Sequence, residues 1–409
     1  PLTKVAWQTT VLAHPETVTA ADAKHGDVVN IKTGHGQVEA IIYSTQQVRP
    51  GTLVMAMGQG HTEFGRYAQN IGVNPVTLLA PKISNMTGGP IFTTGVTSLS
   101  VTGKHIAMAH TDGSRIQHGR KIALSVTWDE LHHHDQSGES HAGKSDGHAE
   151  SLTMEGFPFT LPLKEGYDPK RDFYAAHEHD TYRWGMVVDL DKCIGCAACS
   201  AACYAENNIG IVGKDRILEG REMAWMRVER YLDPEIPQNI TFFPMMCQHC
   251  DNAPCEPVCP VYAPHHSNEG LNNQIYNRCI GTRFCSQNCP YKVRRFNWFE
   301  WEWPEPMELQ LNPDVTVRSK GVMEKCSFCV QRIKDAHGAA KDEKRKIKDG
   351  EVVPACVQTC PTDALIFGNL MDVNSKVRQL AQSDRAYQAM GYLNTKPAVI
   401  YLKKVKHKI

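Results

Sequence analysis

The first 192 residues of this 409-residue chain contain no cysteine, and all fifteen cysteines fall between Cys193 and Cys360. This abrupt change predicts two chemically different parts, because a chain of this length has room for more than one hydrophobic core. An odd number of cysteines cannot all be paired in disulfides, and clusters at two- and three-residue spacing suit metal binding better than cross-linking. The composition therefore favours a metal-binding part that follows a part without thiol chemistry.

Further absences narrow the class of protein. The chain has no excess of charge, with 44 basic and 44 acidic residues, so nothing favours binding to nucleic acid. No apolar run reaches the roughly 18 residues of a membrane span, and we expect none. The sequence opens PLTKVAW, without an initiator methionine or a signal-peptide pattern, so we expect a fragment, or one segment, of a longer chain.

Short runs rich in valine and isoleucine divide the cysteine-free part. They lie at 28–32, 37–43 and 53–57, separated by glycine, proline or polar turns, and predict a meander of strands that closes into a barrel. Between Trp128 and Trp184 the composition shifts to histidine, serine, glycine and acidic residues, which is typical of a linker or surface insertion. A solvated loop is favoured over a metal site here, because such a segment does not preorganise ligands. The histidines concerned include His132, His133, His134, His141 and His148.

The cysteines form four groups. The first lies in CIGCAACSAAC, the second in CQHCDNAPCEPVCP, the third in CIGTRFCSQNCP, and the fourth is split between CSFC and CVQTCP. In chain order the members are Cys193, Cys196, Cys199 and Cys203; Cys247, Cys250, Cys255 and Cys259; Cys279, Cys285 and Cys289; and Cys326, Cys329, Cys356 and Cys360. Proline follows the last cysteine of every group except the first, as in the bacterial ferredoxin run.

The spacing within the groups has a chemical reason. Three thiolates two residues apart in a turning loop can point at three corners of an iron cube, and exposed backbone N–H groups face its sulfides. A cysteine three residues further on points away and, in two-cluster ferredoxins, ligates the other cluster, so groups exchange their last ligand. Zinc is the alternative, since single CxxC pairs would support it. The runs of three cysteines, the trailing Cys-Pro and the lack of complete Cys2His2 sets favour iron-sulfur clusters.

Together the four groups resemble the four-cluster electron-transfer subunit of the dimethyl sulfoxide reductase and nitrate reductase superfamily. The resemblance implies three complete ligand sets: Cys193, Cys196, Cys199 and Cys360; Cys203, Cys326, Cys329 and Cys356; and Cys247, Cys250, Cys255 and Cys289. The last cluster is left with Cys259, Cys279 and Cys285. Its fourth corner faces Thr282, which stands where the repeated spacing requires a cysteine.

Thr282 changes what this last set can bind. A neutral hydroxyl is a weak ligand for iron beside thiolate sulfur, so the fourth iron is expected to be lost. Related subunits that replace this same cysteine bind a three-iron cluster, so the resemblance also implies [3Fe-4S]. The alternative is a four-iron cluster completed by water or by the Thr282 oxygen. We therefore expect three [4Fe-4S] clusters and one [3Fe-4S] cluster.

A second resemblance covers the cysteine-free part. The stretches LAHPETVTAADAKHGDVVNIKTGHGQVEA and RPGTLVMAMGQGHTEFGRYAQNIGVNPVTLL are similar to the C-terminal β-barrel domain, of the double-psi type, of molybdopterin oxidoreductases. The two resemblances imply an α+β fold class, with this β-barrel domain at 1–128, a linker or insertion at 129–180 and a ferredoxin-like four-cluster domain at 181–409. GQGHTEFGRY at 58–67 is open to interpretation as a cofactor-binding loop, but a scaffold loop is favoured on the resemblance.

The fusion of both parts in one chain resembles the iron-sulfur subunit of alternative complex III, a quinol oxidoreductase of bacterial membranes. That resemblance implies an electron-transfer subunit with no substrate-converting site of its own and no molybdopterin. It implies as partners an integral-membrane, NrfD-like quinol-binding subunit and c-type cytochrome subunits, on the periplasmic side of the cytoplasmic membrane. The alternative is the C-terminal part of a genuine molybdenum oxidoreductase, such as a polysulfide or tetrathionate reductase.

Residues outside the cysteine groups carry smaller predictions. Arg294 and Arg295 either offset cluster charge or meet a partner, or else they are solvated at the surface, and the sequence does not decide between a role and solvation. The charged stretch 341–351 is expected to be solvated, 372–391 has helical periodicity, and 398–404 is expected to be a strand. Packing around the clusters, rather than electron transfer, is expected of Trp184, Trp225, Trp298, Trp301 and Trp303.

Overall fold

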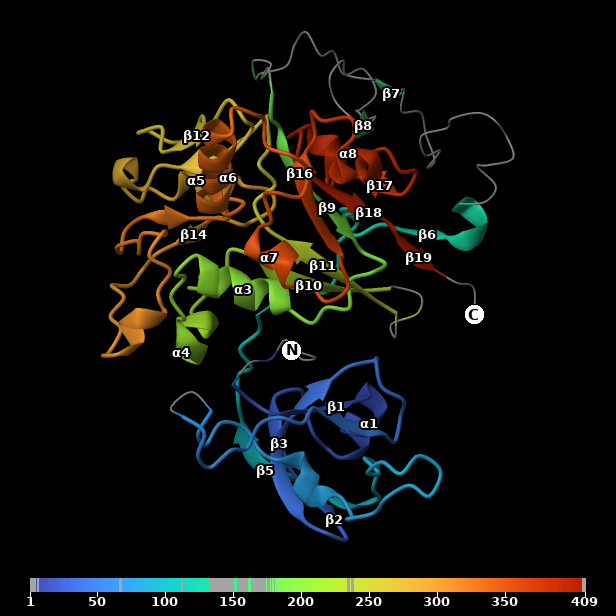
Figure 1. Ribbon diagram of the computed structural model, residues 1–409. Helices are drawn as coiled ribbons and strands as arrows, with labels where there is room; N and C mark the ends of the chain where they lie inside the picture. The colour runs from blue at the N-terminus through green and yellow to red at the C-terminus, as the bar shows by residue number, and fades with distance from the viewer. Residues whose placement is uncertain are drawn as a thin grey trace. The chain divides into compact units, whose positions relative to one another are not determined.

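A computed structural model describes residues 5, 7–65, 68–111, 113–131, 151–152, 161–162, 174, 177, 179, 181–233, 236 and 239–406. The histidines between 132 and 148 lie outside these residues. The chain forms two compact units (Figure 1). The first comprises Pro1–Gly113, Val212–Glu222 and Leu232–Ile240, and the second comprises Ser114–Ile211, Met223–Tyr231 and Thr241–Ile409.

The first unit is built on a five-stranded sheet. Its elements are β1 (Thr10–Ala13), α1 (Pro15–Ala20), β2 (Asp27–Thr33), β3 (Gln37–Ser44), β4 (Leu53–Met55), η1 (Pro75–Leu78) and β5 (Val96–His105). The strand order is β4-β1-β3-β2-β5, with β1 parallel to β3 and the other pairs antiparallel. The strands expected near 28–32, 37–43 and 53–57 are thereby confirmed.

This sheet is open among the described residues, so the expected closed barrel is not formed by them. No pairing joins β4 to β5, the two edge strands, within the described part of the chain. The hydrophobic core lies between the sheet and α1 with η1, and contains Val11, Val29, Ile31, Ile42 and Leu78. Most of β5 is exposed, which identifies it as an edge strand rather than a strand buried by barrel closure.

A four-stranded sheet forms the centre of the second unit. Its order is β16-β9-β18-β17, from β9 (Trp184–Asp189), β16 (Leu365–Asn369), β17 (Ala386–Tyr387) and β18 (Val399–Leu402). Every residue of β9 and of β18 is buried, as expected for inner strands covered on both faces. Helix α8 (Lys376–Ala381) packs its Val377 and Ala381 on one face, against Val187 and Ile400.

The C-terminal segment differs in part from its sequence pattern. The helix expected over 372–391 is limited to α8, because Ala386 and Tyr387 pair with Leu402 and Tyr401 as a sheet edge. A short 3-10 turn, η5 (Gly391–Leu393), follows. The strand expected at 398–404 is confirmed as β18, and β19 (Lys404–Lys406) pairs with β6 (Ser125–Thr127). Tertiary pairing therefore overrode helical periodicity after α8.

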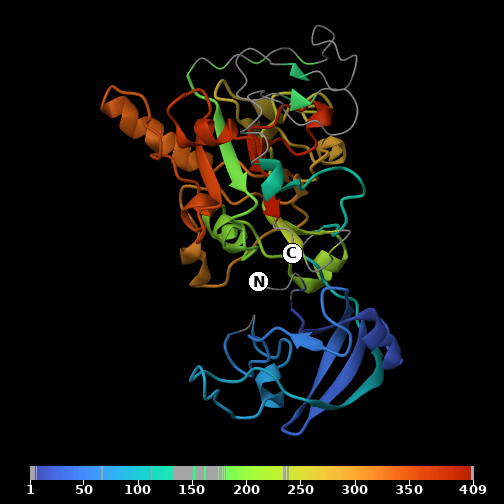
Figure 2. The ribbon, with the colours of Figure 1, turned by 90° about the vertical axis from the view of Figure 1, so that its right-hand side faces the viewer.

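Short elements make up the rest of the chain. They are β7 (Ser151–Leu152), β8 (Leu161–Pro162), α3 (Ala198–Glu206), α4 (Gly213–Leu218), β10 (Arg227–Leu232), β11 (Ile240–Met245), β12 (Pro264–His266), β13 (Asn272–Gln274), η3 (Tyr276–Arg278), α5 (Phe284–Asn288), β14 (Arg295–Phe296), η4 (Met307–Gln310), β15 (Met323–Glu324), α6 (Val330–Asp342) and α7 (Ala355–Gln358). Helix α6, in orange, extends away from the sheet in Figure 2. The charged stretch that follows α6 is a solvent-exposed turn in which Arg345 pairs with Glu343 and Glu351 at 2.5 and 2.7 Å. No helix in the described ranges is long and apolar enough to cross a membrane.

Candidate iron-sulfur cluster sites

The first set of thiols is assembled by the central sheet. Strand β9 runs antiparallel to β16, with Val188 opposite Leu365, so the loop after β9 begins beside the loop that leads into β16. Cys193 follows β9 and Cys360 precedes β16, which brings residues distant in sequence to one end of the sheet. Burial raises the pKa of Cys199 to about 12, and the neighbouring thiols of Cys193, Cys360 and Cys196 contribute to the rise. The four cysteines implied by the resemblance therefore lie together.

The second set combines a helix of the first cysteine group with both halves of the fourth. Cys203 lies in α3, which packs against α7, the helix that contains Cys356 (Figure 1). Burial raises the pKa of Cys203, and the thiols of Cys326, Cys329 and Cys356 raise it further. Cys203 has thus turned away from its sequence neighbours toward a different set, as the crossover spacing predicts.

The third set forms around Cys250. Burial raises the pKa of this thiol, and the next contributions come from Cys247, Cys289 and Cys255. Cys289 belongs to the third cysteine group in sequence, whereas the other three belong to the second. This set therefore also contains a crossover ligand, which the third cysteine group contributes to the second.

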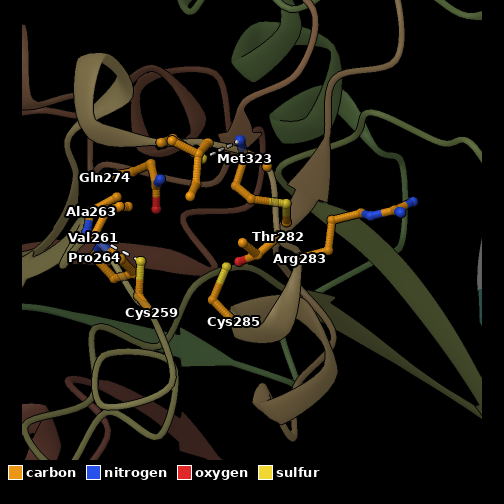
Figure 3. A pocket seen from close by; sticks show the side chains of 12 residues that line it. Cys259, Val261, Ala263, Pro264, Gln274, Thr282, Arg283, Cys285 and Met323 are labelled. Atoms are coloured by element: carbon orange, nitrogen blue, oxygen red, sulfur yellow. Dashed lines mark hydrogen bonds between the residues drawn. The ribbon is translucent and has the colours of Figure 1, made fainter.

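The remaining three cysteines and Thr282 line a single cavity. Its walls include Cys259, Cys279, Cys285, Thr282 and Met323. Figure 3 shows the sulfur atoms of Cys259 and Cys285 and the hydroxyl of Thr282 facing the same space, whereas the side chain of Arg283 points away. The structure thus brings together every residue that the resemblance implies for the fourth set.

The loop around Thr282 keeps the backbone of a cluster-binding loop. Gly281 and Arg283, on either side of Thr282, have φ of 74° and 65°. In the first group, Gly195 and Ala197 flank Cys196 with φ of 68° and 60°. Left-handed φ values at both flanking positions turn the chain around the intervening side chain, and a non-glycine residue adopts them at a cost. Thr282 thus occupies the position that Cys196 has in the first group, in a loop whose flanking residues have the same left-handed conformation.

Backbone N–H groups are aimed at the thiols that precede a proline. Ala263 N–H donates to Cys259 Sγ at 3.3 Å, and Ala364 N–H donates to Cys360 Sγ at 3.3 Å. At Cys289, the third such thiol, the donors are the N–H groups of Val293 and Tyr291. The recurring donor four residues on favours the thiolate form, because a hydrogen bond to the charged form stabilises it.

Two buried cations beside the cysteine sets have no carboxylate partner among the described residues. The side chains of Arg294 and Lys325 are both buried, at 3% and 1% exposure. No described carboxylate lies within 4.0 Å of either cation. Lys325 donates to the carbonyl of Cys326 at 2.8 Å. A buried charge needs a compensating opposite charge, and bound anionic clusters would provide it. The four thiol sets and their surroundings therefore fit iron-sulfur clusters.

The sequence left the position of Arg294 open and did not identify Lys325 as a residue near the cysteine sets. Surface solvation of Arg294 is wrong, since the side chain is buried. Arg295 is half-buried and donates to the carbonyl of Ala224 at 3.0 Å. The cysteine motifs do not identify Lys325. Its place directly before Cys326 is the sequence signal that could have identified it as a cation next to a cluster ligand.

The tryptophans near the sets serve as packing residues where they are buried. Trp184 stacks between Tyr182 and Phe367, and its indole N–H donates to Glu269 at 2.6 Å. Trp225 donates to Glu324 at 3.1 Å. Trp301 lies over Gly210, where a Cβ would meet the ring at 2.2 Å. Trp303 is half-buried and Trp298 is 39% exposed, whereas Trp184 and Trp225 are buried in the interior.

The thiols are not used for cross-links. No disulfide is formed among the described residues, which include all fifteen cysteines. No group of three or more His, Cys, Asp or Glu side chains within the described ranges is arranged to hold a single metal ion. Zinc requires four ligands around one ion, whereas each thiolate of a cubane binds a different iron.

Comparison with protein families agrees with the two-part organisation. Residues 2–96 match the Molydopterin dinucleotide binding domain. Residues 192–263 and 238–304 each match a 4Fe-4S dicluster domain. The second unit, with its crossed cysteine sets, is therefore an iron-sulfur electron-transfer domain.

Individual relatives belong to respiratory oxidoreductases. The iron-sulfur cluster-binding subunit of menaquinone reductase from Nitratidesulfovibrio vulgaris is 41% identical over 226 residues, which are 54% of this chain and 88% of the relative. Iron-sulfur subunit 1 of the Hdr-like menaquinol oxidoreductase from Archaeoglobus fulgidus is 34% identical over 241 residues, 54% of this chain and 83% of the relative. A polypeptide of the polysulfide reductase from Wolinella succinogenes is 31% identical over 215 residues, 53% of this chain and 91% of the relative. The chain belongs to the family of iron-sulfur subunits of respiratory oxidoreductases, and it carries a molybdopterin-type domain in addition.

Proposed function

We propose that this chain is the electron-relay subunit of a membrane-associated quinol oxidoreductase of the alternative complex III type. When bound, iron-sulfur clusters accept and release single electrons. The observation that carries the proposal is the grouping of the thiols: three sets of four cysteines, each with a crossover member, and a fourth set with three cysteines and Thr282. The relatives named menaquinone reductase and menaquinol oxidoreductase support quinol chemistry in the complex.

The proposed ligand sets follow from the same grouping. Three [4Fe-4S] clusters use the three sets of four cysteines, and one [3Fe-4S] cluster uses Cys259, Cys279 and Cys285, with Thr282 at its open corner. The chain's own residues hold the clusters, exclude water and set the local charge. Electrons from a quinol site in an NrfD-like membrane subunit would pass through these clusters to c-type cytochromes on the periplasmic side.

A molybdenum enzyme is the second candidate, and the match of residues 2–96 to the Molydopterin dinucleotide binding domain favours it. The relative from polysulfide reductase supports the same class. We propose that the first unit is a scaffold without molybdopterin, in which GQGHTEFGRY at 58–67 is a structural loop. The two candidates differ in the metal that the complex contains.

Metal analysis of the anaerobically purified complex tests the proposal. Three four-iron clusters and one three-iron cluster account for fifteen iron atoms on this chain's fifteen cysteines, and a difference in iron content between the intact complex and one lacking this subunit isolates that number. The proposal expects molybdenum and tungsten to be far below one atom per complex. Near-stoichiometric molybdenum or tungsten would establish the second candidate instead.

A further inference from the structure

Arg294 lies between the third and fourth sets of ligands. One guanidinium nitrogen donates to Cys255 Sγ at 3.4 Å, and the neighbouring thiols of Cys255 and Cys285 raise the pKa of Arg294. Cys255 belongs to the third set, and Cys285 lines the cavity of the fourth. The same side chain is fixed by Asn272, at 3.3 Å from the guanidinium, and by Gln274. One cation is therefore held between thiols of two neighbouring sites.

The guanidinium of Arg294 has no carboxylate partner among the described residues. Other partly or fully buried arginines pair with carboxylates, among them Arg183 with Asp251 at 2.9 Å, Arg318 with Glu324 at 2.9 Å and Arg332 with Glu206 at 2.7 Å. The groups on Arg294 are instead sulfur and neutral amide oxygen. A buried guanidinium without a carboxylate is costly unless anionic groups face it, and thiolates with bound clusters would be those groups.

A short strand pair holds Arg294 in place. Arg294 directly precedes β14. In this strand, Arg295 pairs with Glu324 of β15, and Phe296 pairs with Met323 of β15. The β15 strand also supplies the N–H of Met323 to Cys279 Sγ at 3.3 Å. Extending the register by one residue places Arg294 opposite Lys325, the other buried cation without a carboxylate. Like charges at opposing positions destabilise a strand pair, so compensation by bound anions accounts for both cations at once.

We infer that Arg294 raises the reduction potentials of both the third and the fourth cluster. It thereby sets the energy at which an electron passes between these two clusters. The inference rests on the proposed ligand sets. Reduction adds one negative charge to a cluster, and a fixed cation beside it favours the more negative state. Because the guanidinium donates to Cys255 of the third set and to Gln274, which lines the cavity of the fourth, its effect reaches both, whereas the first set is assembled at the central sheet without it.

Substitutions of Arg294 in the purified complex test this inference by potentiometric EPR titration. Arg294→Gln keeps amide donors and removes the charge, and Arg294→Lys keeps the charge. We expect the Gln variant to lower the potentials of the third and fourth clusters, each by at least a tenfold change in the reduction equilibrium, or about 59 mV for a one-electron couple. The Lys variant should shift both by less than half of that amount, and the first cluster should not move in either variant.

Lys325→Met supplies the matched control, because Lys325 is an equally buried cation that contacts Cys326 of the second set. It should lower the potential of the second cluster and leave the fourth unchanged. Retained iron with unchanged potentials in Arg294→Gln would overturn the inference and leave the proposed function standing. An equal shift of all four clusters would also overturn it, since that pattern reports a general structural change. A wild-type complex without clusters in the third and fourth sets would overturn both.

Discussion

The side-chain amide of Asn207 donates to Cys203 Sγ at 3.6 Å and to the carbonyl of the same residue at 3.1 Å. Cys203 closes the one cysteine group that is not followed by proline, and it lies inside α3. In a helix, the N–H four residues on is bonded to the carbonyl, as Asn207 N–H is to Cys203 O at 3.1 Å. The side chain of Asn207 thus replaces the backbone donor that the Cys-Pro groups direct at sulfur.

Replacement of Asn207 by alanine should lower the reduction potential of the second cluster, because a hydrogen bond to a ligand sulfur is lost. Loss of a buried hydrogen bond should also cost about 1 kcal/mol of stability. Asn208→Ala is the control: Asn208 is also buried and donates to the carbonyls of Asn312 and Val315, at 2.8 and 2.6 Å. A redox titration in which both variants shift the second cluster equally would show that Asn207 has no specific effect on sulfur.

Thr282→Cys should convert the fourth cluster from three irons to four. The loop already has the backbone conformation of the loop around Cys196, so the new thiolate would occupy the open corner without rearrangement. The oxidised protein should lose its [3Fe-4S] EPR signal, and quinol oxidation should slow as the potential of this cluster falls. Thr282→Ser keeps a hydroxyl and should leave the signal unchanged. Persistence of the signal and of full quinol oxidation in the Cys variant would make Thr282 incidental.

Cys203→Ser should damage the second cluster and spare the first. The thiol of Cys203 lies with Cys326, Cys329 and Cys356, although its sequence neighbours form the first set. Cys196→Ser should produce the opposite result, since this thiol lies with the first set. Cluster-resolved EPR distinguishes the two outcomes. Loss of the first cluster in the Cys203 variant would show that ligands pair locally and not by crossover.

Gly281→Ala should destroy the fourth site selectively. Gly281 has φ of 74°, and an added Cβ would meet the carbonyl oxygen of Gly321 at 2.5 Å. Strain in this backbone region costs on the order of 1–3 kcal/mol, and the backbone clash adds to it. Gly350→Ala is the control, with φ of 83° but open space around the new Cβ. Iron analysis should show loss of about three irons in the first variant and none in the second; equal retention would contradict the role given to the loop.

The assignment of each cysteine to a set came from the family resemblance, whereas the cysteine spacing alone was sufficient to predict cluster-binding groups that exchange their last ligand. It was insufficient for features that depend on tertiary pairing. Periodicity favours a helix at Tyr387, but this residue pairs with Tyr401 as a strand. The barrel was expected from short apolar runs, which specify strands and not whether the edges of a sheet meet. The burial of Arg294 likewise depends on two cysteine sets whose proximity no local pattern encodes.

Quantitative EPR of the oxidised, anaerobically purified complex, combined with its iron content, tests the central claim most directly. An oxidised three-iron cluster is paramagnetic, whereas an oxidised four-iron cluster is not, so the two types separate in one measurement. The account predicts one [3Fe-4S] spin per chain together with fifteen irons bound by the fifteen cysteines. An oxidised protein with full iron and no such spin would contradict the role given to Thr282. Zinc in place of iron would contradict the account as a whole.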